Sequence, residues 1–506
     1  MTLVLSLLPK GCVSRYELHR IGPVGLGVLC RMAYIKGIKG KNMSDNKNNF
    51  GDPSDEEPPH LSSTTPAERK RAFRILFISL LGLGMGQNLF FAVVPPIARD
   101  LGLDEIETSV IFSLSALLWV LSSTYWGRRS DTMGRKPVMM IGLAGFGVST
   151  LGFAAVVWTG LIGLLPLLWV FPLLIFVRAI FGTFGSGTHP ASQAYVADRT
   201  SKADRAVGVA QLGAAFGLGT VIGPGFAAAL TQIHILAPFV AVSVLSFGGM
   251  FAIWFFLPER TPPRSKKRWY GFFFGHYSGE SNEAVLERTL SEEAMQAQLE
   301  QEKTAPAGPK LRWWDKRVLP LVVMGVVLAF SQTISMQTIA FFFMDQLKIS
   351  DAKEAAQLVG VGLMAMAMAT LFAQVGIIQR FNLGVPTLLR LGAGVTVLAF
   401  LLLVFGGAYG VYVSALALAG LGFGLFRPGL QAMGSLAVSV KDQGAIAGII
   451  GSTAATGHIL NPIIGMPLYQ IWPEGPYALG AVLMSILFLY AWFHPSIRAM
   501  AAEEDA

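Results

Sequence analysis

Long apolar stretches separated by short polar breaks run from about residue 70 to about residue 495 of the chain. A helix needs about 20 apolar residues to cross a bilayer, and each of these stretches is long enough. We therefore predict about twelve membrane-spanning helices. The predicted spans are 72–98, 106–126, 137–158, 164–197, 206–231, 237–257, 318–345, 355–378, 386–406, 409–438, 443–471 and 475–494.

The composition supports this interpretation. Hydrophobic residues make up 53% of the 506 residues and charged residues 14%, whereas about 25% of the residues of an ordinary soluble domain are charged. These values exclude a water-soluble globule and a disordered chain. The two cysteines, Cys12 and Cys30, have no metal-ligand spacing, so we expect neither a metal site nor a structural disulfide. The predicted fold class is an all-α membrane protein.

Basic residues collect in alternate polar breaks, and this bias predicts the orientation. They precede the first span and follow the second and the fourth: Arg69, Lys70, Arg71, Arg74, Arg128, Arg129, Arg135, Lys136, Arg199, Lys202 and Arg205. The other breaks contain Arg99, Lys348 and Lys353 as exceptions. We expect both termini to be cytoplasmic, and the net charge of +8 then reflects topology rather than nucleic-acid binding.

The spans divide into two halves around a long polar segment. We predict a cytoplasmic tail at 1–70, six-helix halves at 71–257 and 318–495, a cytoplasmic linker at 258–317 and a tail at 496–506. Within the linker, Ser281–Lys303 is either a surface helix or a solvated tether. Met43 opens a typical polar tail, so translation is expected to start there.

The two halves contain an internal repeat. Gly182–Phe239 aligns with Gly420–Tyr477 without a gap, at an offset of 238 residues. The matched pairs include Pro190 with Pro428, Gln193 with Gln431, Asp204 with Asp442, Gly219 with Gly457 and Pro224 with Pro462. Two copies of a six-helix unit are typical of transporters whose halves rock around a central site.

A polar sequence, Gly127-Arg-Arg-Ser-Asp-Thr-Met-Gly-Arg-Lys-Pro137, follows the second span. Glycines at both ends of this expected loop permit a tight turn. The sequence resembles the signature loop of the major facilitator superfamily, although Thr132 stands where a basic residue is usual. The resemblance implies secondary transport by alternating access. It assigns gating to Gly127, Asp131, Gly134, Arg135 and Lys136, with Asp131 as a latch that bonds across the interface of the halves.

The fifth predicted span is rich in glycine and contains a proline. Gly213, Gly217, Gly219, Gly223 and Pro224 are similar to the motif of twelve-span drug/proton antiporters, which include tetracycline exporters. Close helix packing alone also explains small residues at this spacing.

The fourth predicted span resembles a second motif of the same superfamily. Arg178 precedes Gly182, Gly185 and Gly187, and in the superfamily an intramembrane arginine at this place is associated with proton coupling. The resemblance therefore makes Arg178 a candidate for coupling.

Charges inside spans are expensive and usually functional. No acidic residue lies in the middle of a predicted span, and Gln87 and Asn88 stand in the region where tetracycline exporters carry an acid. The interior charges are basic: Arg427 and, when protonated, His189. Both favour an anionic or strongly polarised substrate. Alternatively, Arg427 bonds carbonyl groups freed by Pro428, and His189 is a packing residue.

Neutral hydrogen-bonding groups complete the candidate site and suit an amphipathic ligand. The predicted substrate contacts are Arg427, His189, Gln193, Gln431, Gln87, Asn88 and Gln332. The predicted proton-coupling residues are Arg178 and His189. Gln337, His458 and Asn461 provide further polar groups.

The chain is thus expected to be a proton-coupled exporter of small amphipathic, drug-like compounds in a bacterial inner membrane. The alternatives are a dedicated permease or exporter of an anionic metabolite, such as an organic acid or siderophore, and a non-transporting receptor. No ATP-binding phosphate loop occurs. We expect no enzymatic activity, no cofactor and no nucleic-acid partner, and we expect a monomer that contacts lipid, protons and a small-molecule substrate.

Overall fold

The computed structural model describes residues 66–200, 205–258, 312–315, 317–439, 442–495 and 497, and every regular element in these ranges is a helix. The elements of the N-terminal half are α2 (Pro66–Asp100), α3 (Glu105–Met133), α4 (Arg135–Leu161), α5 (Leu167–Phe184), the 3₁₀ turn η2 (Gly185–Gly187), α6 (Thr188–Ala197), α7 (Arg205–Thr231) and α8 (Ala237–Phe256). α5, η2 and α6 follow one another without a break and form the fourth pass.

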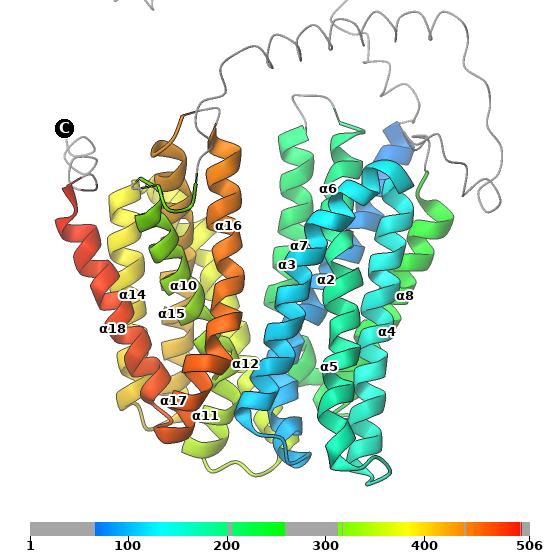
Figure 1. Cartoon of the computed structure of the whole chain (residues 1–506), viewed down its shortest axis with the longest axis horizontal. Coiled ribbons are helices and arrows are strands. Elements are labelled where there is room, and N and C mark those ends of the chain that lie inside the picture. Colours follow the sequence, from blue (N-terminus) through cyan, green and yellow to red (C-terminus); the bar gives the residue numbers. More distant parts are fainter. Residues whose placement is uncertain are drawn as a thin grey trace, which may run out of the picture. The chain divides into compact units, whose positions relative to one another are not determined.

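The C-terminal half repeats this order with more interruptions. Its elements are α10 (Leu319–Gln337), α11 (Ile339–Gln346), α12 (Ala352–Phe372), the π turn η3 (Ala373–Ile378), α13 (Gln379–Phe381), α14 (Val385–Phe405), α15 (Tyr409–Leu436), α16 (Gln443–Leu460), the π turn η5 (Asn461–Gly465), α17 (Met466–Ile471) and α18 (Gly475–Phe493). The two halves are coloured blue to green and yellow-green to red in Figure 1.

Eleven helical segments in the described ranges are long and apolar enough to cross a membrane. The remaining predicted span, 443–471, is a continuous run of α16, η5 and α17. η5 contains Pro462, which lacks a backbone N–H and so favours an irregular turn at this point. The prediction of an all-α membrane protein with about twelve spans is confirmed. The start at Met43 and the linker segment Ser281–Lys303 lie outside the described residues.

α7 lies directly on the backbone of α2 because two of its glycines have no side chain. A Cβ atom at Gly219 would overlap the carbonyl oxygen of Leu81, and a Cβ atom at Gly223 would overlap the α2 backbone one turn further on. Gly457 of α16 meets the carbonyl oxygen of Ala329 in α10 in the same way. The repeat in the sequence is therefore also a repeat of helix packing.

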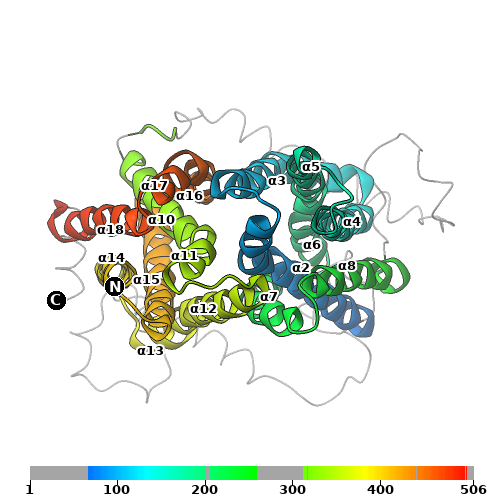
Figure 2. The same ribbon diagram turned by 90° about the horizontal axis from the view of Figure 1, so that it is seen from below.

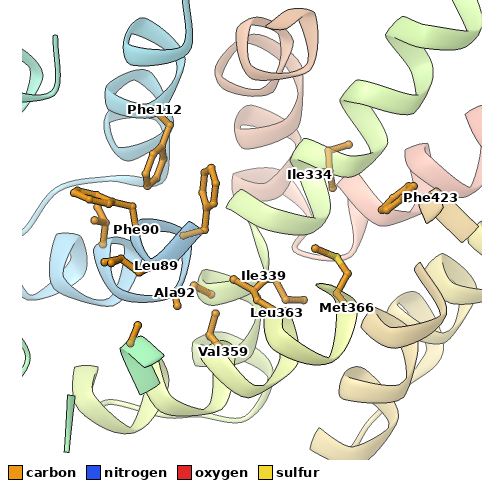
Figure 3. Packing of buried hydrophobic residues seen from close by; sticks show 14 of the residues in the cluster. Leu89, Phe90, Ala92, Phe112, Ile334, Ile339, Val359, Leu363, Met366 and Phe423 are labelled. Atoms are coloured by element: carbon orange, nitrogen blue, oxygen red, sulfur yellow. The ribbon is translucent and has the colours of Figure 1, made fainter. Parts of the chain in front are cut away.

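The two halves pack together through α12, which contacts α2 and α7, and through α16, which contacts α3 (Figures 1 and 2). Figure 3 shows part of this interface, where Ala92 of α2 lies near Ile339 of α11 and near Val359 and Leu363 of α12. All four side chains are buried. One apolar core thus extends through both halves.

α3 and α4 are separated by a single residue, Gly134. Its φ of 99° lies in the region that favours glycine, and its N–H bonds the carbonyl oxygen of Ser130. The segment from Gly127 to Met133 is helical. The expectation of a loop with a turn at both glycines is therefore wrong for Gly127. Arg135, just beyond this turn, bonds Asp131 and Ser130 on the last turn of α3 and so stabilises the end of that helix.

The two ends of the helical bundle differ in charge. We call the end with the first turn of α2 and the α3–α4 turn the basic end, after Arg69, Arg128 and Lys136. We call the opposite end, where α2 finishes and α3 begins, the Arg99 end. α2 and α3 run antiparallel between these two ends.

Candidate functional site

Arg427 of α15 and Gln332 of α10 form the first polar pair of the candidate site. The Nη2 atom of Arg427 donates a hydrogen bond to Oε1 of Gln332, and both residues are partly exposed. No bond from Arg427 to a carbonyl group freed by Pro428 is found among the described contacts, and the choice between the two roles of Arg427 stays a prediction. A guanidinium held by a neutral amide keeps its full charge and further N–H donors for a bound anion.

The other predicted substrate contacts are not gathered around Arg427. His189 of α6 is partly buried, and its ring meets Phe216 of α7 edge-on at 5.4 Å between centroids. Gln193 is partly exposed and Gln431 is exposed. Among the described residues no hydrogen bond joins any of these three to Arg427. Their role in substrate contact stays a prediction.

Two polar residues of α2 behave differently from each other. Asn88 donates from Nδ2 to the carbonyl oxygen of Thr220 at 3.0 Å and so fastens α2 to α7. The neighbouring Gln87 has a buried Oε1 atom with no hydrogen-bond partner in the described part of the chain. A buried carbonyl oxygen without a donor is costly. Gln87 is therefore the better of the two as a ligand contact.

Arg178 of α5 lies in an aromatic cage. Its guanidinium carbon is 4.0 Å from the ring centroid of Phe90 and 4.6 Å from that of Phe181. The side chain is buried, and neither Nε nor Nη1 has a hydrogen-bond partner among the described residues. Cation–π contacts stabilise the charge by about 2 kcal/mol when it is desolvated, but no carboxylate neutralises it.

The predicted gating motif is organised by Arg135 at the basic end. Its Nη2 lies 2.7 Å from Oδ1 of Asp131, its Nε lies 3.1 Å from Oδ2 of Asp198, and its Nη1 donates to Ser130 at 2.6 Å. The neighbouring Lys136 bonds carbonyl oxygens at the end of α8. All these partners lie in the N-terminal half. The expected bond of Asp131 across the interface is thus absent from the described contacts.

A polar network that the sequence did not predict joins the two halves. Ser109 of α3 donates from Oγ to Oε1 of Gln337 in α10 at 2.8 Å. Asn461 of η5 donates from Nδ2 to the same Oε1 at 2.7 Å and to Oγ of Ser109 at 3.1 Å. All three side chains are fully buried. Gln337 Oε1 is thus the shared acceptor that connects α3 to the C-terminal half.

His458 of α16 extends this network. Its Nδ1 lies 2.9 Å from Nε2 of Gln337, and its carbonyl oxygen accepts from Oγ of Ser113 in α3. Its ring stacks on Phe91 of α2 with 6.2 Å between centroids and 13° between planes. His458 therefore contacts both halves, and its ring is the titratable group closest to their junction in the described network.

A second network closes the Arg99 end. Arg99 binds Asp345 of α11 and also pairs with Glu105 at 3.0 Å. The hydroxyl of Tyr469 in α17 donates a hydrogen bond to Asp345, and Nε2 of Gln470 donates one to Glu105 at 3.2 Å. In the sequence, Arg99 stood out only as a basic residue on the side that otherwise lacks them. That unusual position was the available sign that Arg99 has acidic partners there.

The side-chain hydrogen bonds described between the two halves all belong to one of these two networks. The first network joins the first turns of α3 to α10, α16 and η5. The second joins the last turn of α2 and the first turn of α3 to α11 and α17. The halves are therefore bonded at the Arg99 end. At the basic end, Arg135 of the gating motif pairs with Asp131 and Asp198 of its own half.

The described residues contain no group of three side chains able to hold a metal ion. Their acidic groups lie at helix ends and turns, as with Glu105, Asp131, Asp198 and Asp345. The charges deep in the helices are those of Arg178 and Arg427. A bound anion or a polarised oxygen would meet complementary charge there, whereas an organic cation would not.

Residues 76–462 match the family model of the Major Facilitator Superfamily. The chain is 27% identical over 441 residues to the class G tetracycline resistance protein of Vibrio anguillarum, covering 82% of this chain and 96% of that protein. It is 28% identical over 468 residues to major facilitator superfamily domain-containing protein 10 of Mus musculus, covering 84% and 93%.

The fold also matches solved structures. One is a bacterial homolog of the human lysosomal transporter Spinster, described as inward-facing and unoccupied. The TM-score is 0.59 at 14% identity, and the match covers 85% of this chain and 96% of that one. At this identity, the match shows a shared fold and nothing about function.

Proposed function

Because the chain belongs to the Major Facilitator Superfamily and is a secondary transporter, we propose that it exports small amphipathic compounds in exchange for protons. Its curated relatives include tetracycline and multidrug resistance proteins that it matches over most of its length. Export and proton coupling are carried over from that similarity. The proposed location is a bacterial inner membrane, with the basic end and both termini on the cytoplasmic side.

The proposed division of the chain follows from the repeat. The halves 71–257 and 318–495 rock as two units, and the cytoplasmic linker 258–317 joins them. The described hydrogen bonds between the halves lie toward the Arg99 end, which supports an access state open to the cytoplasm. In the opposite state, Asp131 is proposed to bond across the interface.

The observation that carries the substrate assignment is the Arg427–Gln332 pair. The permanent positive charge of Arg427 lies among apolar helices, beside the partly exposed amide of Gln332. We propose that this pair holds the polar head of the substrate, which is anionic or strongly polarised, while apolar side chains hold the remainder.

The same pair supports a second candidate function. A transporter dedicated to one anionic metabolite would use Arg427 in the same way but would accept few compounds. The absence of deep carboxylates among the described residues favours this candidate over classical exchange of organic cations for protons.

Transport by purified protein in proteoliposomes with an imposed pH gradient tests the proposal. Internal pH is followed while anionic, neutral and cationic amphipathic compounds are added one at a time. Proton movement that depends on anionic or polarised compounds supports the proposal, and a response to cations alone contradicts it. A response to one anion only would select the dedicated transporter.

Arg427→Gln is the key variant, and Arg390→Gln is its matched control. Arg390 is in the same half but bonds the carbonyl oxygen of Ala491 at 3.1 Å and stacks on Trp492 at 4.3 Å, away from Gln332. We expect Arg427→Gln to abolish transport and Arg390→Gln to retain it. Equal flux in both variants would remove Arg427 from the substrate site.

A further inference from the structure

The hydrogen bonds around His458 follow from the orientation of the Gln337 amide, which Ser109 and Asn461 hold, while Oδ1 of Asn461 has no hydrogen-bond partner among the described residues. Gln337 must present Oε1 to Ser109 and Asn461, because the Asn461 amide nitrogen and the Ser109 hydroxyl both donate to it. Its Nε2 then faces the ring of His458. An amide N–H₂ has no acceptor, so Nδ1 of His458 must be the unprotonated nitrogen. The network fits a neutral histidine.

A second proton on the ring does not fit this network. Protonation at Nδ1 would place an N–H against the N–H₂ of Gln337, and two donors repel each other. The amide of Gln337 must then turn so that Oε1 faces the ring. Ser109 and Asn461 lose the acceptor that they share, and the link between α3 and the C-terminal half is broken unless Asn461 turns as well.

No charged group in the described part of the chain competes for the ring. Among the elements that pack against α16, or against its ring, the charged groups toward the Arg99 end are bonded to other residues, and Arg128 and Arg129 of α3 lie at the basic end. On α2 and α3, Arg99 pairs with Glu105, and on α15 Arg427 bonds Gln332. Tyr469 of α17 bonds Asp345. Glu107 caps the first turn of α3. The ring itself contacts Phe91 and Gln337 and is partly exposed.

We propose that His458 is a proton-binding site and that Gln337 converts its protonation into opening of the Arg99 end. This inference rests on the proposed proton coupling and names a residue for it. The proton enters from water at the partly exposed ring and binds Nδ1. The Gln337 amide turns, the Ser109–Gln337–Asn461 bridge opens, and α3 separates from α10 and α16. Loss of the proton restores the bridge.

Accessibility of the buried interface measures this opening without any substrate. Ala92→Cys is the reporter, since Ala92 is buried beside α11 and α12 (Figure 3). It is placed in a background with Cys12→Ser and Cys30→Ser, which removes both native cysteines. A membrane-impermeant maleimide is added to spheroplasts, where the Arg99 end faces the medium. Labelling rates are compared at about pH 8 and about pH 4, an interval that extends well below the ordinary pKa of an imidazole. Each rate is divided by that of Ile233→Cys, an exposed position in the α7–α8 turn, at the same pH, because the thiolate that reacts with maleimide becomes scarcer as the pH falls.

We expect the relative labelling rate of the reporter to be severalfold higher at the lower pH and to be independent of pH after His458→Gln. Gln337→Glu should also abolish the pH dependence but keep labelling slow. Its two carboxylate oxygens accept from protonated His458 and from the bridge together. His234→Gln, in the α7–α8 turn, is the matched histidine control and should keep the full response.

Three results would overturn the proposal. These are a relative labelling rate of the reporter that does not change with pH, a pH response of that rate that survives His458→Gln, and a high relative labelling rate of Gln337→Glu at low pH. A transport measurement separates this proposal from the proposed function. His458→Gln should keep exchange of substrate for substrate and lose accumulation driven by a pH gradient. If the wild type moves substrate without protons, the proposed coupling fails, whatever the labelling shows.

Discussion

The guanidinium of Arg99, in the last turn of α2, binds both carboxylate oxygens of Asp345 in α11, with nitrogen–oxygen distances of 2.5 and 2.9 Å. The two residues belong to different halves and are 246 positions apart. Two parallel bonds fix a guanidinium and a carboxylate in one plane, so this pair is more specific than a single surface contact. It holds the Arg99 end closed.

Asp345→Asn should shift the protein toward the state that is open at the Arg99 end. Loss of one partly exposed ion pair costs about 1 kcal/mol, which changes the ratio of the two states about fivefold. Labelling of Ala92→Cys from that side measures the shift. The exchanged pair, Arg99→Asp with Asp345→Arg, should return part of the closed population. An unchanged labelling rate in Asp345→Asn would show that the ion pair does not hold the gate.

Gly219→Ala should destabilise the protein, because a methyl group would enter the backbone of α2 at Leu81. Overpacking of this kind costs about 1–3 kcal/mol. Gly213→Ala is the matched control on the same helix, since nothing lies within 4 Å of a Cβ atom there. Thermal unfolding in detergent should show a lower midpoint for Gly219→Ala alone. Equal midpoints for the two variants would contradict the close contact of α7 with α2.

The repeat extends this prediction to the C-terminal half. Gly457→Ala should behave like Gly219→Ala, because its Cβ atom would meet the carbonyl oxygen of Ala329. Gly451→Ala should behave like Gly213→Ala, since both positions face open space. A mild effect of Gly457→Ala would mean that the two halves share sequence without sharing this contact.

Arg178→Met should stabilise the protein and impair its coupling. The buried cation has aromatic faces around it but no anion or hydrogen-bond acceptor at Nε and Nη1 among the described residues. Replacing even paired buried charges by hydrophobic residues often gains about 1–4 kcal/mol. Unfolding measurements should therefore show a higher midpoint, while transport driven by a pH gradient falls. Arg390→Met, at a partly exposed and hydrogen-bonded arginine, should change neither. A destabilised Arg178→Met variant would mean that the cage outweighs the desolvation of the charge.

Asp131→Asn should leave stability nearly unchanged, because Arg135 keeps its contacts with Asp198 and Ser130. It should nevertheless reduce the population open at the Arg99 end, since Asp131 is proposed to bond across the interface only in that state. Cysteine probes at both ends measure the two populations. Asp198→Asn removes the other partner of Arg135 and serves as the comparison. The same shift in both variants would assign the effect to Arg135 rather than to a latch at Asp131.

The helices could be predicted from the sequence because span length and apolar character are local properties. The gating motif was partly misread, since a string of polar residues after Gly127 suggested a loop. Arg135 instead pairs with Asp131 one helical turn earlier and supports the helix up to Gly134. Charge and glycine content alone do not distinguish these two arrangements.

The contacts between the halves could not be predicted in this way. Ser109 and Gln337 are 228 positions apart, and neither stands in a motif. Gln337, His458 and Asn461 were noted only as neutral polar residues. Their relationship depends on which faces of α3, α10 and α16 meet, and the three-dimensional packing of the helices decides that.

The single residue between α3 and α4 has a mechanical consequence. A connection of one residue is too short to absorb a change in the angle between the helices, so a tilt of α3 also tilts α4. At the other end of α4, five residues separate it from α5 and can absorb a displacement. A fluorescent protein or epitope inserted after Gly134 would therefore uncouple the two helices, whereas the same insertion after Gly163 would leave their movement intact.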